Sequence, residues 1–128
     1  MENFTPHLLS SSTITGDEVY NSQGKHLGEV KELMIDLNTG QVAYAVLSFG
    51  GFLGMGDKLF ALPFEALTLN TDLKYFVLDV DKETLDNAPG FDKDHWPSAP
   101  DRSFIDRIYT HYGYEPYYKN QGRLSSIV

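Results

Sequence analysis

Two long apolar segments joined by a short polar turn dominate the first half of the chain. Over residues 27–37, apolar and polar side chains alternate with the period of two that is typical of a half-buried β-strand. The alternation places Leu33, Ile35 and Leu37 together on one face, which we expect to be buried. Val30 is out of phase with these three residues, and this offset predicts a β-bulge directly after it.

The segments that follow continue a series of short strands. Polar residues and a glycine at 38–40 are typical of a hairpin loop in which Gly40 takes the left-handed conformation. The return strand over residues 41–49 is apolar on both faces, so we expect it to be covered on both sides. A third strand over residues 58–62 ends at Pro63, because proline cannot donate a hydrogen bond to a ladder.

The remaining elements complete a mainly β domain. The pattern and the turn signals predict strands at 13–20, 67–70 and 73–80, a short helix at 82–87 and a second helix at about 101–112. Many short strands with turns between them argue for a small antiparallel barrel or a sandwich. We therefore divide the chain into a flexible arm (1–12), a β domain (13–91) and a C-terminal extension with a Tyr-rich tail (92–128).

Five segments of this β domain resemble the PRC-barrel family, in the right order and with the right gaps. They are GKHLGEV at 24–30, IDLNTGQVAYAV at 35–46, GGFLGMG at 50–56, LPF at 62–64 and LDNAPGF at 85–91. Each segment alone is a weak signal, whereas the five together are specific.

The resemblance implies both a fold and a kind of function. PRC-barrel domains form a six-stranded β-barrel, found in the photosynthetic reaction-centre H subunit, in a ribosome-maturation factor and in stand-alone prokaryotic proteins. We therefore expect a small, closed, antiparallel six-stranded barrel over residues 13–91, with a short helix and a C-terminal helical extension. In those settings the domain resembles a docking or assembly module, so we expect no enzymatic activity and no cofactor.

Composition and charge limit the partners and the location. The 128 residues include 18 Asp and Glu against 10 Lys and Arg, which gives a formal net charge of −8. An acidic surface repels phosphate, so we expect no direct nucleic-acid binding. No segment approaches the roughly 18 consecutive apolar residues of a membrane span, and the N-terminus lacks the pattern of a signal peptide. The chain has no cysteine, which is compatible with a reducing compartment, and we expect a cytoplasmic protein.

A glycine cluster at residues 50–56 is the first candidate for a site. It matches neither phosphate-binding pattern, and its apolar members are unlike a phosphate cradle. A flexible connection between strands explains the glycines. Phe52, Leu53 and Met55 are then candidates for exposed partner-binding side chains.

Metal binding and catalysis have little support in the sequence. Asp92, Asp94 and His95 are the one small group that could gather a divalent ion on a loop, although acidic turns are more often simply solvated. There is no HExxH or GxSxG motif. We therefore assign no catalytic, cofactor or metal residue.

Aromatic residues in the C-terminal extension give the second candidate surface. In the predicted helix at about 101–112, apolar residues fall on one stripe, which covers either the chain's own barrel or a second copy. Trp96, Tyr114, Tyr117 and Tyr118 are candidates for partner contacts, because amphipathic aromatic residues are favoured at interfaces.

These observations predict a non-enzymatic interaction or assembly module that self-associates as a homodimer. One alternative is a ribosome-assembly accessory factor that docks on a basic protein, which is an argument from fold analogy alone. The other alternative is a barrel that binds a small ligand or a metal.

Overall fold

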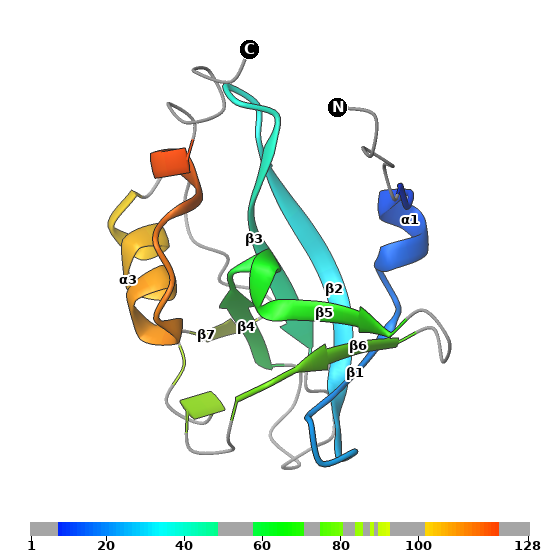
Figure 1. The fold of residues 1–128 in the computed structure, drawn as a ribbon. Helices are drawn as coiled ribbons and strands as arrows, with labels where there is room; N and C mark the ends of the chain where they lie inside the picture. Colours follow the sequence, from blue (N-terminus) through cyan, green and yellow to red (C-terminus); the bar gives the residue numbers. More distant parts are fainter. Residues whose placement is uncertain are drawn as a thin grey trace, which may run out of the picture.

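The chain forms a curled β-sheet with a helix packed on one of its faces (Figure 1). This computed structural model describes residues 8–48, 58–70, 75–80, 84–85, 88, 90–92 and 102–120. Its strands are β1 (Glu18–Tyr20), β2 (His26–Asp36), β3 (Gln41–Ser48), β4 (Lys58–Leu62), β5 (Leu67–Asn70), β6 (Tyr75–Leu78) and β7 (Gly90–Asp92). Its helices are α1 (Ser11–Ile14), α3 (Arg102–Tyr112) and the 3-10 helices η1 (Phe64–Ala66) and η2 (Tyr117–Asn120).

The order of the strands corrects the predicted barrel. Seven strands follow the order β5-β6-β1-β2-β3-β4-β7, and neighbours are antiparallel except for the parallel pair β1 and β6. Within the described residues the end strands β5 and β7 do not pair with each other, so the sheet is not closed. The prediction of a mainly β fold is confirmed, whereas the prediction that the sheet closes into a purely antiparallel barrel is wrong. Turn signals specify hairpins between successive strands, but β1 pairs with a strand far along the sequence, which no local pattern encodes.

The hairpin of β2 and β3 follows the predicted backbone closely. Its register shifts between Val30 and Glu32 and leaves Lys31 without an opposite residue, so the predicted bulge is confirmed. A second shift leaves Ala43 unpaired on β3. Gly40 has a φ of 76°, which confirms the left-handed conformation predicted for the loop.

The buried face predicted for β2 is wrong at its C-terminal end. Leu33 is half-buried against the core, whereas Ile35 is 46% exposed and Leu37, in the loop, is 91% exposed. Alternation shows which side chains share a face, but burial also requires neighbouring elements over that face. The hairpin extends past the described elements that could cover these two residues.

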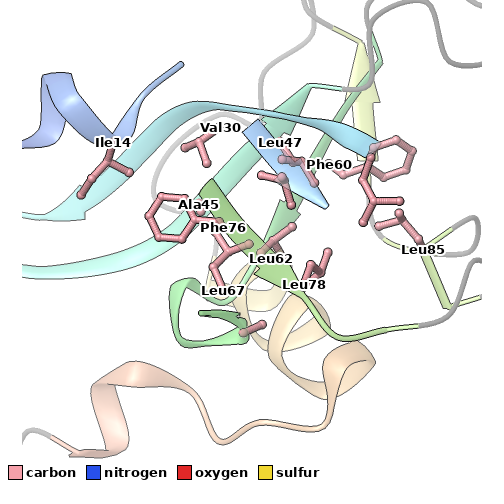
Figure 2. Packing of buried hydrophobic residues seen from close by; sticks show 13 residues of the cluster. Ile14, Val30, Ala45, Leu47, Phe60, Leu62, Leu67, Phe76, Leu78 and Leu85 are labelled. Carbon is pink, nitrogen blue, oxygen red and sulfur yellow. The ribbon is translucent and has the colours of Figure 1, made fainter. Parts of the chain in front are cut away.

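The main core lies on the inner face of the curled sheet, where side chains of β1 to β6 converge with Ile14 and Leu85 (Figure 2). We call this the inner cluster. Its buried residues are Ile14, Val19, Leu27, Val30, Ala45, Leu47, Phe60, Leu62, Ala66, Leu67, Phe76, Leu78 and Leu85.

A second core lies on the opposite, outer face of β3 and β4, under α3. We call this the outer cluster, and its buried residues are Ala43, Tyr44, Val46, Leu59, Ala61, Phe104, Ile108 and Tyr109. Because β3 contributes to both clusters, the prediction that this strand is covered on both sides is confirmed. The open question about the C-terminal helix is also answered, since α3 packs on its own sheet.

The N-terminal elements differ from the prediction. A helical turn, α1, precedes β1, so the strand predicted over 13–20 begins only at Glu18. The side chain of Ser10 caps α1 by accepting a hydrogen bond of 3.2 Å from the backbone N–H of Thr13. Gly16, with a φ of 94°, then turns the chain into β1. Residues 1–7 lie outside the described residues, and the limits of the predicted arm remain a prediction.

The short helix predicted at 82–87 is described only in part. Thr84 and Leu85 are helical, and Leu85 is buried in the inner cluster. The carbonyl oxygen of Thr84 lies 2.7 Å from the Nε2 atom of His111 in α3. This contact ties the segment after β6 to the C-terminal helix.

Candidate functional site

The free end of the β2–β3 hairpin is the candidate site, and Figure 1 shows it extending beyond the rest of the sheet. We call it the hairpin end and define it as residues 32–44. Strand β1 pairs with β2 only as far as Glu29, after which Gly16 and Asp17 bond to Val30. Strand β4 pairs with β3 only from Ala45 onward. In the part of the chain that the structure describes, β2 and β3 are therefore each other's only strand neighbours at the hairpin end.

Local hydrogen bonds around Asp36 build the loop that closes the hairpin end. The Asp36 carbonyl accepts hydrogen bonds from the backbone N–H groups of Thr39 at 3.2 Å and Gly40 at 2.8 Å. Its carboxylate oxygen Oδ1 accepts from the N–H of Asn38 at 2.9 Å. Aspartate side chains commonly accept such a bond from the backbone two residues further on, so the local sequence favours this loop.

The hairpin end carries apolar side chains beyond the core. Ile35 lies opposite Val42, on the inner face that Leu33 shares, and Leu37 follows in the loop. Single exposed aliphatic residues are common, and the two that lie together at this end of the hairpin make it a candidate contact surface. Sequence reasoning placed these residues in the core. The length of β2, 11 residues against a usual ~5–6, was the signal that part of it projects.

The 3-10 helix η2 anchors the C-terminal segment to the hairpin end. The Tyr117 hydroxyl donates a hydrogen bond of 2.6 Å to Oδ2 of Asp36, and its ring packs against Tyr109 with centroids 6.1 Å apart. The bond from Tyr117, followed by those from the N–H groups of Asn38 and Thr39, lowers the pKa of Asp36 below its usual value. Asp36 is therefore a carboxylate at neutral pH.

A buried hydrogen bond from α3 also reaches the hairpin. The Tyr109 hydroxyl donates to the carbonyl oxygen of Ala43 at 2.6 Å. Ala43 is the bulged residue of β3, so its carbonyl is not part of a regular ladder. Burial raises the pKa of the Tyr109 phenol, which remains a neutral donor. The bulge and the tyrosine together fix the position of α3 against β3.

Two of the three predicted tail tyrosines have partners within the chain. Tyr117 binds Asp36. The Tyr118 hydroxyl donates a hydrogen bond to Asp106 and accepts one from Nε of Arg102. The Arg102 guanidinium also lies over the Tyr118 ring. Tyr114 is 39% exposed, and its N–H bonds to the carbonyl of Tyr109 to end α3. Of this predicted set, Tyr114 presents the most open ring to solvent.

The other predicted contact residues, Phe52, Leu53, Met55 and Trp96, lie outside the described residues. The same is true of Asp94 and His95 and of the Asp92 side chain, which form the metal alternative. These predictions remain predictions.

Across the described ranges, no group of three His, Asp or Glu side chains is arranged to hold a metal ion. His26 contacts Glu18 on the surface, where both side chains are about half exposed. None of the helices in the described segments is long and apolar enough to cross a membrane.

Comparison with known proteins places this sheet in a family. A family model for the PRC-barrel domain matches residues 6–85, which is more than half of the chain. The chain therefore belongs to the PRC-barrel domain family, as predicted, and the match covers four of the five sequence segments and ends at Leu85, the start of the fifth. The match includes β1 to β6 and the whole hairpin end, and it stops before α3 and η2. No curated protein matches the chain.

Proposed function

We propose that this chain is a non-enzymatic protein-interaction module whose contact surface is the hairpin end. The observation that carries the proposal is the exposure of Ile35 and Leu37 at the tip of a hairpin most of whose other apolar residues pack into the two clusters. Burying the almost fully exposed Leu37 side chain contributes up to roughly 1.5–3 kcal/mol, and the half-exposed Ile35 contributes less. The family supports this function, since a PRC-barrel domain is consistent with a small interaction module. The proposal includes a cytoplasmic location and requires no cofactor.

Self-association was one predicted form of this function, and the structure changes where it could occur. The apolar stripe of α3 is buried against β3 and β4, so this stripe is not available as a dimer contact. The hairpin end is then the surface through which we expect a homodimer to form, because Leu37 is 91% exposed there. Docking on another protein is the other form of the same proposal.

Site-specific photo-crosslinking tests the proposed surface. A photoreactive amino acid replaces Leu37 in one variant and Gln23 in a control variant, where Gln23 is an exposed residue in the turn between β1 and β2. Illumination in the native host should give discrete crosslinked species from position 37 and none from position 23. Crosslinks from both positions or from neither would overturn the proposal.

Light scattering behind a sizing column separates the two forms of the function. A dimer mass for the purified chain that falls to a monomer mass when Leu37→Asp is introduced supports self-association. A monomer mass together with heterologous crosslinks at position 37 supports a separate partner.

A further inference from the structure

Among the described residues, the edge of β2 that faces away from β3 has no strand beside it at the hairpin end. On one side, residues 32–36 pair with β3. On the other side, the last contacts from the β1 segment are the bonds of Gly16 and Asp17 to Val30. No strand in the described ranges continues along β2 from there. An exposed strand edge is a template for a further strand, because its backbone donors and acceptors are already aligned.

The side chains along this edge alternate in chemistry. Leu33 and Ile35 lie on the inner face, where Leu33 touches the inner cluster. Glu32, Met34 and Asp36 lie on the outer face, where Met34 touches the outer cluster and Asp36 binds Tyr117. The edge therefore offers two apolar side chains on one face and two carboxylates, four residues apart, on the other.

We propose that the hairpin end binds an extended, basic segment of a partner protein, which adds to β2 as a further strand. This inference rests on the proposed function and names its partner by chemistry. Opposite residues in paired strands share a face, so residues opposite Leu33 and Ile35 are apolar and residues opposite Glu32 and Asp36 are basic. The partner pattern is thus basic, apolar, any residue, apolar, basic. The net charge of −8 draws such a segment toward the chain.

A second copy of this chain is a poor occupant of the same edge. A symmetric dimer would pair two β2 edges antiparallel about a twofold axis. Only the register centred on Met34 pairs all five residues from 32 to 36. That register sets Leu33 opposite Ile35, but it also sets Glu32 opposite Asp36 twice. Like charges directly opposite each other destabilise strand pairing, and Asp36 stays ionised because Tyr117 and the loop N–H groups lower its pKa.

Synthetic peptides provide the probe. A short fluorescent peptide with the central sequence Lys-Val-Thr-Val-Lys is titrated with the full chain, and anisotropy is recorded at about 0.15 M salt. A control peptide carries Glu in place of both Lys. Two further peptides are N-methylated, one at both Val and the other at both Lys, because only alternate N–H groups of a strand point toward its neighbour.

Two protein variants give a matched comparison. Glu32 and Glu29 are exposed residues of the same strand, but Glu29 lies opposite Glu18, where β1 already occupies the edge. Glu32→Lys should weaken binding of the basic peptide by roughly threefold to tenfold, the range expected when a cross-strand charge pair is reversed. Glu29→Lys changes the net charge equally and should leave binding nearly unchanged. Glu32→Lys should also improve binding of the Glu peptide.

Each outcome decides the inference. Saturable binding of the Lys peptide, sensitivity to Glu32→Lys alone and loss of binding on only one of the two N-methylated peptides support strand addition. Absence of saturable binding, equal weakening by the two variants, or equal behaviour of the N-methylated peptides would overturn it. If crosslinking at position 37 persists after such a result, only strand addition fails. If crosslinking is also absent, the proposed function fails with it.

Discussion

From the packing of α3 against the sheet, we predict how much the substitution Ile108→Ala lowers the free energy of unfolding. Ile108 is 0% exposed and lies in the outer cluster with Val46 of β3 and Leu59 of β4. If α3 belongs to the folded domain, truncation of this side chain costs stability. If the helix were a loosely attached extension, truncation would cost almost nothing.

The magnitude follows from the atoms removed. Isoleucine to alanine removes three carbon groups, which corresponds to about 2.4 kcal/mol of transfer free energy at ~0.8 kcal/mol for each group. The cavity left in a packed interior adds to this value, and measured substitutions of this type span roughly 2–5 kcal/mol. We expect the free energy of unfolding to fall by about 3–4 kcal/mol, which is a large part of the ~5–15 kcal/mol typical of one domain.

Urea unfolding followed by far-UV circular dichroism measures the effect. The matched control is Ile35→Ala, the same truncation at a residue that is 46% exposed at the hairpin end, where we expect a loss of about 1 kcal/mol or less. The dependence of unfolding free energy on urea should not change, because both variants expose the same surface on unfolding. If Ile108→Ala costs no more than Ile35→Ala, the packing of α3 on β3 and β4 is refuted.

Three further predictions concern the turn and the tyrosines. Gly40→Ala should destabilise the chain by about 1–2 kcal/mol in thermal or urea unfolding, because alanine is strained at a φ of 76°. Gly40→Asn should recover part of the loss, since asparagine tolerates that conformation, and an unchanged Gly40→Ala variant would contradict the loop geometry. Tyr117→Phe should raise the pKa of Asp36 in an NMR titration, because the main cause of its lowered value is removed. Because the pKa of Asp36 is lower in the folded chain, its carboxylate adds stability at pH values above the ordinary aspartate pKa near 4. That stability is lost as the pH falls through the lowered pKa of the folded chain. The Tyr117→Phe variant should therefore lose less stability on acidification than the original chain. Burial raises the pKa of Tyr109, so the neutral phenol contributes to the stability of the folded chain. This contribution to the free energy of unfolding is complete below the ordinary phenol pKa near 10 and is lost as the pH rises above it. Unfolding free energy should therefore decline as pH rises beyond about 10, and Tyr109→Phe should flatten that decline.

The limits of sequence-based prediction are clearest along β2. The bulge after Val30 and the left-handed Gly40 were predicted because both follow from neighbouring residues. The exposure of Ile35 and Leu37 was not predicted, because it depends on where β1 and β4 end in space. The candidate site was missed for the same reason, since its apolar residues match a buried strand pattern.

The C-terminal extension shows the same division. Helical spacing of apolar residues predicted a stripe near 101–112, and that stripe could cover its own sheet or a second copy. The structure decides between them through the bond from Tyr109 to the Ala43 carbonyl and through the burial of Ile108. Tyr117 and Tyr118, predicted as partner contacts, have partners in the chain that lie far away in sequence or on the preceding helix.

The sequence alone determined the family, the mainly β class, the hairpin loop and the bulge, because each is encoded by residues within a few positions of one another. Only the tertiary structure decided that β1 and β6 are parallel and that α3 covers the outer face of β3 and β4. It also decided that, within the described part of the chain, the sheet is open and the edge of β2 at the hairpin end has no strand beside it. Those features depend on which distant segments meet, and the free energy of such contacts comes from packing and burial that a one-dimensional pattern does not contain.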